Sequence, residues 1–148
     1  MKSEWEDKFL PKLSKYHGTH SKKVFHRLMK KSSTLRSSLK RRSRDYEVLF
    51  SCTLFEIRQM LYKAYGKKCK YCKKTLLVDN IVCDHVKPIS HGGASIMSNL
   101  QLICKSCNIK KGPLTHKEFN GILKFLKKEE SHVRAYVLRK LATKEVFK

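Results

Sequence analysis

Two cysteine motifs constrain the fold of this chain more than any other feature. They are Cys69-x-x-Cys72 and Cys104-x-x-Cys107, with 31 residues between them. Zinc prefers four soft or borderline ligands in a tetrahedron, and a C-x-x-C turn presents two sulfurs to one ion about 2.3 Å away. We therefore predict one structural zinc ion that is bound by all four thiolates and joins these two segments.

Other uses of the cysteines are less well supported. The N-terminus lacks the charged-then-apolar layout of an export signal, so we expect a reducing compartment and no disulfide framework. A redox C-x-x-C normally occurs once near a βαβ unit, and the sequence shows no such unit. Cys52 and Cys83 stand outside the two motifs. Because a free cysteine behaves as a small hydrophobe, we predict that both are buried.

The charge of the chain indicates a polyanionic partner. Its 148 residues contain 34 Lys and Arg against 12 Asp and Glu, which gives a formal net charge of +22 and a pI near 10.0. Such a surface attracts phosphate backbones, so nucleic acid is the leading partner. No apolar run is long enough to cross a bilayer. We expect a soluble, intracellular protein in the cytoplasm, or in that of the host if the source is viral, with no membrane partner.

Sequence patterns predict a mixture of helices and short strands. Capping boxes at Thr53 and Thr115 each have a Glu three residues later, which indicates helix starts. The first of these helices should run for about 12 residues and stop before Gly66. Runs of β-prone residues and turn residues predict the rest. We expect a short strand at 46–50, a hairpin of 76–78 with 81–83, a loop at 90–95, a strand at 99–103, a short helix or turn at 107–111, and a last helix at 131–143.

These elements predict an α+β fold with one small core and two flanks. Residues 51–115 should form the core, residues 116–148 a C-terminal helical segment, and residues 1–50 a basic N-terminal extension that contacts DNA. Within the extension, residues 30–44 are basic and carry only two leucines, four apart. This pattern fits either an exposed helix or a disordered arm. The C-terminal helices can either pack on the zinc core or form a homodimer face.

The residues between and after the cysteine pairs resemble a known family. Asp84-His85 and Asn99 lie between the pairs, and Asn108 directly follows Cys107. The segments CKYC, DHVKPISHGG, SNLQLICKSCN and KKG, in this order, resemble the HNH family of endonucleases in its branch with two zinc knuckles. The resemblance covers roughly residues 53–115. It implies a ββα-metal core that is stapled by the four-cysteine zinc site and flanked by helices on both sides.

The chemistry of phosphodiester hydrolysis fits the same residues. The reaction needs an activated water, a cation that offsets developing charge, and donors that hold the phosphate in line. The neutral imidazole of His85 can accept a proton from water near neutral pH. Asp84 and the amide oxygen of Asn108 are hard ligands suited to Mg²⁺ or Mn²⁺. The acids are scarce here, since residues 67–114 hold nine lysines but only Asp79 and Asp84.

Further roles follow from the resemblance or from position. Asn99 matches the family's middle Asn, which bonds across the loop between the strands and holds the histidine in place. His91, Lys110 and Lys111 are candidate phosphate contacts, although a solvated loop histidine and ordinary surface lysines are the simpler readings. His17, His20 and His26 do not suggest a second metal site, because no cysteine or carboxylate completes a shell.

Two functions from different classes remain at this point. The first is an HNH endonuclease or nickase that cuts DNA with a divalent metal and, as the resemblance implies, leaves 5′-phosphate and 3′-hydroxyl ends. The second is a non-catalytic zinc module that binds nucleic acid, in which Asp84 and His85 merely complete a hairpin. Both would hold DNA mainly through backbone phosphates and would be sensitive to salt. A test for DNA cleavage distinguishes the endonuclease from the non-catalytic module.

Overall fold

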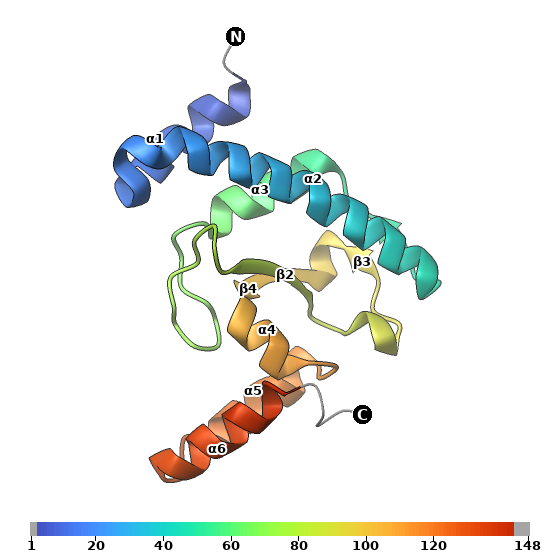
Figure 1. Ribbon diagram of the computed structural model, residues 1–148. Coiled ribbons are helices and arrows are strands. Elements are labelled where there is room, and N and C mark those ends of the chain that lie inside the picture. The colour runs from blue at the N-terminus through green and yellow to red at the C-terminus, as the bar shows by residue number, and fades with distance from the viewer. Residues whose placement is uncertain (1–2, 144–148) are drawn as a thin grey trace.

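The computed structural model describes residues 3–143 and combines helices with two small sheets (Figure 1). This mixed architecture confirms the predicted α+β class. The helices are α1 (Glu4–His17), α2 (Ser21–Asp45), α3 (Leu54–Ala64), α4 (Lys105–Lys111), α5 (His116–Leu126) and α6 (Ser131–Leu141). The strands are β1 (Phe50–Ser51), β2 (Ile81–His85), β3 (Ser95–Ile96) and β4 (Leu100–Cys104). Three 3₁₀ turns complete the chain: η1 (Gly18–His20), η2 (Ile89–His91) and η3 (Met97–Asn99).

A β-hairpin followed by a short helix lies at the centre of the molecule (Figure 1). Strands β2 and β4 pair antiparallel, with Ile81 opposite Cys104 and His85 opposite Leu100. The connection between them is long and carries η2, β3 and η3. It turns tightly at Gly93, where an added Cβ would lie 1.9 Å from the carbonyl oxygen of Lys87. Helix α4 begins directly after β4 and ends at Lys111, with Gly112 as its C-cap. The helix or turn predicted at 107–111 is therefore a helix, which begins two residues earlier than expected.

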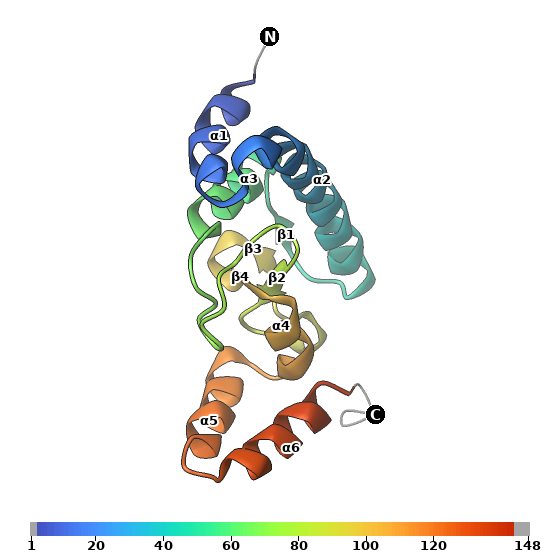
Figure 2. The same cartoon turned by 60° about the vertical axis from the view of Figure 1, so that its left-hand side comes forward.

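The basic N-terminal residues form two helices that pack onto this core. Residues 30–44 lie inside the 25-residue helix α2, so the helical alternative is correct and the disordered arm is not. Buried side chains recur along one face of α2, and Leu28 is fully buried there, whereas the basic side chains lie mostly on the other faces. Helix α1 packs against α2, with the rings of Phe9 and Phe25 6.0 Å apart. Figure 2 shows α1, α2 and α3 grouped at one end of the molecule.

Two strands expected from the sequence, at 46–50 and at 76–78, differ in the structure. The strand expected at 46–50 begins only at Phe50, because Tyr46, Glu47 and Val48 bond back to the end of α2 in a turn. This short β1 pairs in parallel with β3.

The expected hairpin of 76–78 with 81–83 is wrong. Residues 81–83 do belong to β2, but β2 pairs with β4. The backbone of Leu76 instead bonds to Gly66 and Lys67, across the loop that carries Cys69 and Cys72. Asn80 shapes the turn between the two segments by accepting from the Leu77 amide and donating to the Thr75 carbonyl. The backbone groups of Leu76 that a local hairpin would have used are therefore bonded to Gly66 and Lys67, at the start of the cysteine loop.

Both predicted capping boxes and the C-terminal helices are present. Thr53 and Thr115 each accept from the amide three residues on, while Glu56 and Glu118 bond back to the cap. The ring of Phe119 in α5 is fully buried and packs edge-on against Tyr71 of the cysteine loop at 4.8 Å. In the part of the chain that the structure describes, no helix is both long and apolar enough to cross a membrane.

If α2 is part of the core, then Leu28→Ala should lower the free energy of unfolding by about 2–5 kcal/mol, because it leaves a cavity under the helix. The same substitution at Leu49, whose side chain is exposed, should cost about 0.5 kcal/mol or less. Urea unfolding followed by circular dichroism measures both. Equal effects of the two substitutions would show that α2 does not contribute to the folded core.

Candidate metal centre and catalytic hollow

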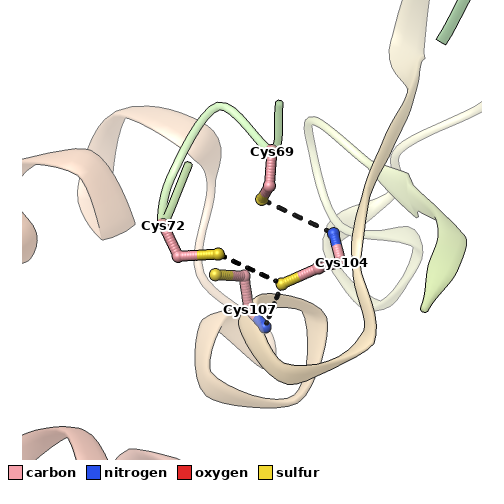
Figure 3. Close-up of side chains that lie close together, drawn as sticks. All are labelled: Cys69, Cys72, Cys104 and Cys107. Atoms are coloured by element: carbon pink, nitrogen blue, oxygen red, sulfur yellow. Dashed lines mark hydrogen bonds between the residues drawn. The ribbon is translucent and has the colours of Figure 1, made fainter. Parts of the chain in front are cut away.

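The four cysteines of the two motifs meet at one point (Figure 3). The sulfur atoms of Cys69, Cys72, Cys104 and Cys107 all lie within 4.8 Å of one another, and those of Cys72 and Cys104 are 3.4 Å apart. A tetrahedron of sulfurs 2.3 Å from one ion has edges of about 3.8 Å. Both the donor type and the spacing therefore fit a zinc ion.

Local backbone bonds give the two cysteine turns their shape. In the first, the amide of Lys73 donates to the carbonyl of Cys69, and Lys73 adopts the left-handed conformation with a φ of 67°. In the second, Cys104 is the N-cap of α4, and its sulfur accepts from the amide of Cys107 at 3.4 Å. Burial raises the pKa of the Cys69 thiol, but backbone amides that donate to its sulfur outweigh this effect and bring the pKa to about 7. Such amides favour the thiolate that zinc requires.

The other two cysteines lie apart from this cluster. Cys52 is buried, and its thiol donates to the carbonyl of Ser95 at 3.1 Å. Cys83 is half-buried on β2, and desolvation with the nearby Asp84 raises its pKa to about 12. Both thus remain protonated packing residues, although Cys83 is less buried than the sequence suggested.

Cys72→Ser should abolish stoichiometric zinc binding, with a loss of at least about a hundredfold in affinity, since it removes a direct ligand. Cys72 suits the test because its side chain is exposed, so its replacement disturbs no packing. Cys52→Ser serves as the control and should retain one zinc per chain. Metal analysis of the purified proteins gives the answer, and an unchanged zinc content in Cys72→Ser would contradict the four-cysteine site.

A second group of polar residues surrounds a hollow of about 280 Å³ at the end of β2. Asp84 and His85 reach it from β2, and Asn108 reaches it from the middle of α4. Arg42 and Tyr46 line it from the end of α2. We call this cavity the His85 hollow. The structure thus brings together three of the residues that the sequence singled out, and adds a cation and a phenol from the N-terminal segment.

His85 is held by a chain of hydroxyl groups that leads back to α2. Its Nε2 lies 2.8 Å from Oγ of Ser95, and Oγ of Ser43 donates to that same oxygen at 2.7 Å. All three side chains are buried. Burial lowers the pKa of His85, and the charges of Arg42 and Lys111 lower it further, against the opposing effect of Asp84. The imidazole is therefore neutral at neutral pH and able to accept a proton.

Asp84 is buried with partners on both carboxylate oxygens. Gln101 donates to Oδ2 at 2.8 Å, and Nζ of Lys111 lies 3.0 Å from the same oxygen and donates to Oδ1 at 3.3 Å. Lys111 also donates to the carbonyl of His85 at 2.9 Å. Its side chain is fully buried, so the structure places it against Asp84 rather than on the surface, where we had expected a phosphate contact. The sequence offered no sign that this lysine, and not Lys110, turns inward.

The remaining predicted residues occupy distinct positions. Asn99 accepts from the amide of Lys87 at 2.9 Å and donates to the carbonyls of Lys87 and Ala94, so it bonds across the β2–β4 connection. Its own carbonyl accepts from Val86, next to His85. His91 is exposed at the end of η2 and does not line the His85 hollow. Lys110 is half-buried on α4 and also lies outside the hollow.

The oxygen atoms that line the hollow suit a divalent cation that prefers oxygen ligands. Asp84 offers a carboxylate and Asn108 an amide, the ligands that Mg²⁺ and Mn²⁺ accept together with water and phosphate oxygens. Among residues 3–143, no hydrogen bond uses the Asn108 side chain, so its oxygen is available. Lys111 competes for Asp84, which means that the cation would share this carboxylate with an ammonium group.

Lys111→Met should destabilise the protein by about 3–5 kcal/mol when no divalent cation is added, because it leaves the buried carboxylate of Asp84 without its counter-charge. Lys110→Met is the matched control, since this neighbouring lysine makes no ion pair among the described residues. Chemical unfolding of both variants tests the difference. A Lys111→Met protein as stable as Lys110→Met would show that the pair contributes nothing.

The comparison with protein families agrees with this geometry. Residues 69–114 match the family described as HNH endonuclease. The match begins at Cys69 and extends three residues past the end of α4, so it spans both cysteine turns, β2 and β4. It confirms the resemblance and supports a nuclease-type or nucleic-acid-binding function for this HNH segment. A comparison with curated proteins found no match.

Several residues of the hollow were missed by the sequence reasoning. Ser95 and Gln101 lie inside the HNH segment but resemble ordinary loop and strand residues. Arg42, Ser43 and Tyr46 lie more than 20 positions before it. A weak signal existed, because Ser43 would fall on the buried face if residues 21–45 were read as one amphipathic helix.

Proposed function

We propose that this protein is a metal-dependent HNH endonuclease that hydrolyses phosphodiester bonds in DNA. The observation that carries the proposal is the meeting of Asp84, His85 and Asn108 around one hollow, within a segment that matches the HNH family. The nearby cation of Arg42 and the large positive charge of the chain favour a phosphate-bearing substrate. DNA is the substrate that this family implies.

In the proposed reaction, His85 acts as the general base. Its neutral imidazole takes a proton from water while the water oxygen forms a bond to phosphorus. The bond from phosphorus to the 3′ oxygen then breaks, and that oxygen takes up a proton. The products are a 5′-phosphate and a 3′-hydroxyl end. Arg42 would offset the negative charge that accumulates on the phosphate oxygens.

Other side chains would hold the reacting groups in place. Asp84 and Asn108 would hold a Mg²⁺ or Mn²⁺ ion, which would supply positive charge to offset the negative charge that develops in the reaction. Asn99 would fix the connection after His85 through its three hydrogen bonds. Lys110 and His91 lie outside the hollow, and we assign them at most contacts to phosphates that flank the cleaved one.

A non-catalytic nucleic-acid-binding module is the second candidate. One observation favours it, namely the buried ion pair between Lys111 and Asp84, which already neutralises the carboxylate. In that case the polar residues of the hollow would serve the fold alone. The zinc site and the basic surface would then suffice for binding.

His85→Ala should lower the rate of plasmid cleavage with Mg²⁺ or Mn²⁺ by at least about 10²-fold, the effect expected for loss of a general base. Zinc content and DNA affinity should stay almost unchanged, because His85 lies outside the cysteine cluster and is only 5% exposed, at the His85 hollow. His26→Ala on the exposed side of α2 is the control and should cleave normally. Cleavage at the normal rate by His85→Ala would refute the assignment of the base. A wild-type protein that binds DNA yet never cleaves it would favour the second candidate.

A further inference from the structure

A groove runs along α2 and borders the His85 hollow. It encloses about 620 Å³ between α2 and the strands β2 and β4. Arg42 and Cys83 line both this groove and the His85 hollow, so the two cavities are adjacent. We call it the α2–β2 groove. A chain that extends from a phosphate in the hollow past Arg42 would therefore reach this groove.

The groove has cationic walls and an apolar floor. Arg27, Lys30, Lys31 and Arg42 line it from α2. Arg27 pairs with Asp79 at 2.7 Å, and Lys31 donates to the carbonyl of Val78. Lys30 and Arg42 make no ion pair among residues 3–143, so two charges remain for a partner.

The floor consists of aliphatic side chains from α2, α3 and the hairpin. Leu35 of α2, Val82 of β2 and Leu102 of β4 are half-buried and present apolar surface to the groove. Leu61 of α3 and Ile81 of β2 lie buried beneath them. A DNA duplex stacks its bases inside and offers mainly phosphates to a groove of this kind, which would leave the apolar floor uncovered. A single strand offers phosphates together with unstacked base faces. Positively charged grooves bind the phosphates of such strands, and unpaired bases can pack against apolar as well as aromatic side chains.

We propose that the α2–β2 groove binds a single-stranded nucleic-acid segment that adjoins the phosphate in the His85 hollow. This inference rests on the proposed function and narrows its substrate to DNA with an unpaired flank at the cleavage site. Helix α2 is then one wall of the substrate channel. The opposite side of α2 is also strongly basic, with Arg36, Lys40, Arg41 and Arg44 around another hollow, but that hollow shares no residue with the His85 hollow.

Adjacent residues on α2 provide matched variants for the test. Ser38 lines the α2–β2 groove, whereas Ser37 lines the opposite basic hollow. Likewise, Arg42 lines the α2–β2 groove and Arg41 lines the opposite basic hollow. Ser38→Glu and Ser37→Glu therefore add the same charge on opposite sides of one helix, and Arg42→Gln and Arg41→Gln remove the same charge. Zinc content and circular dichroism report whether each variant is folded.

Binding is measured by fluorescence anisotropy with a labelled 12-nucleotide single strand and a 12-base-pair duplex, without added divalent metal. Ser38→Glu should weaken single-strand binding about tenfold, because a negative charge faces the strand in a confined groove. Arg42→Gln should also reduce the slope of log affinity against log salt by about 0.7, the value for one lost phosphate contact on a single strand. Ser37→Glu and Arg41→Gln should change single-strand affinity by less than about twofold.

The outcomes separate this inference from the proposed function. Equal weakening by both members of a pair would overturn the groove, since binding would then reflect overall charge. Equal weakening of duplex and single strand by Ser38→Glu would overturn the single-stranded occupant. Since Arg42→Gln alters an exposed side chain, it keeps the test valid if Ser38→Glu does not fold. A wild-type protein that cleaves nothing but shows the predicted binding differences would refute the nuclease and leave the groove standing.

Discussion

The meeting of four sulfur atoms holds the rest of the site in position. It joins the loop after α3 to the junction of β4 and α4, two segments that no continuous sheet connects. Tyr71 lies within the first cysteine turn, and Gln101 donates to its hydroxyl oxygen at 3.1 Å. Gln101 in turn donates to Asp84. The first cysteine turn is therefore linked to the candidate catalytic carboxylate of Asp84 through two side chains, those of Tyr71 and Gln101.

Features that depend on neighbouring residues or on a motif with fixed spacing could be predicted from the sequence. The capping boxes at Thr53 and Thr115 are local hydrogen-bond patterns, and the structure contains both. The cysteine motifs specify their own geometry, because each turn orients two sulfurs. The grouping of Asp84, His85 and Asn108 into one candidate site came with the family resemblance, and the helix or turn that carries Asn108 came from the sequence pattern at 107–111. The four cysteines, the two strands and α4 could thus be anticipated from residues 69–111.

The sequence did not reveal the contacts of residues whose partners in the fold lie far away in the chain. Residues 76–78 have the composition of a strand, but the cysteine loop binds their backbone first. Lys111 and Lys110 look alike in the sequence, and only the turn of α4 toward β2 makes one a buried partner of Asp84 and leaves the other half-exposed. The hydroxyl chain from Ser43 to His85 depends on the docking of α2, which no short motif records.

That hydroxyl chain sets a limit on how this protein can be divided. The segment that matches the HNH family contains His85 and Ser95 but neither Ser43 nor Arg42. Residues 69–114 moved into another scaffold would keep all four zinc ligands. They would lose α2, whose Ser43 bonds to the Ser95 hydroxyl that contacts His85. The segment that matches the family and the set of residues that hydrogen-bond toward His85 therefore have different boundaries, and the second begins at least as early as α2.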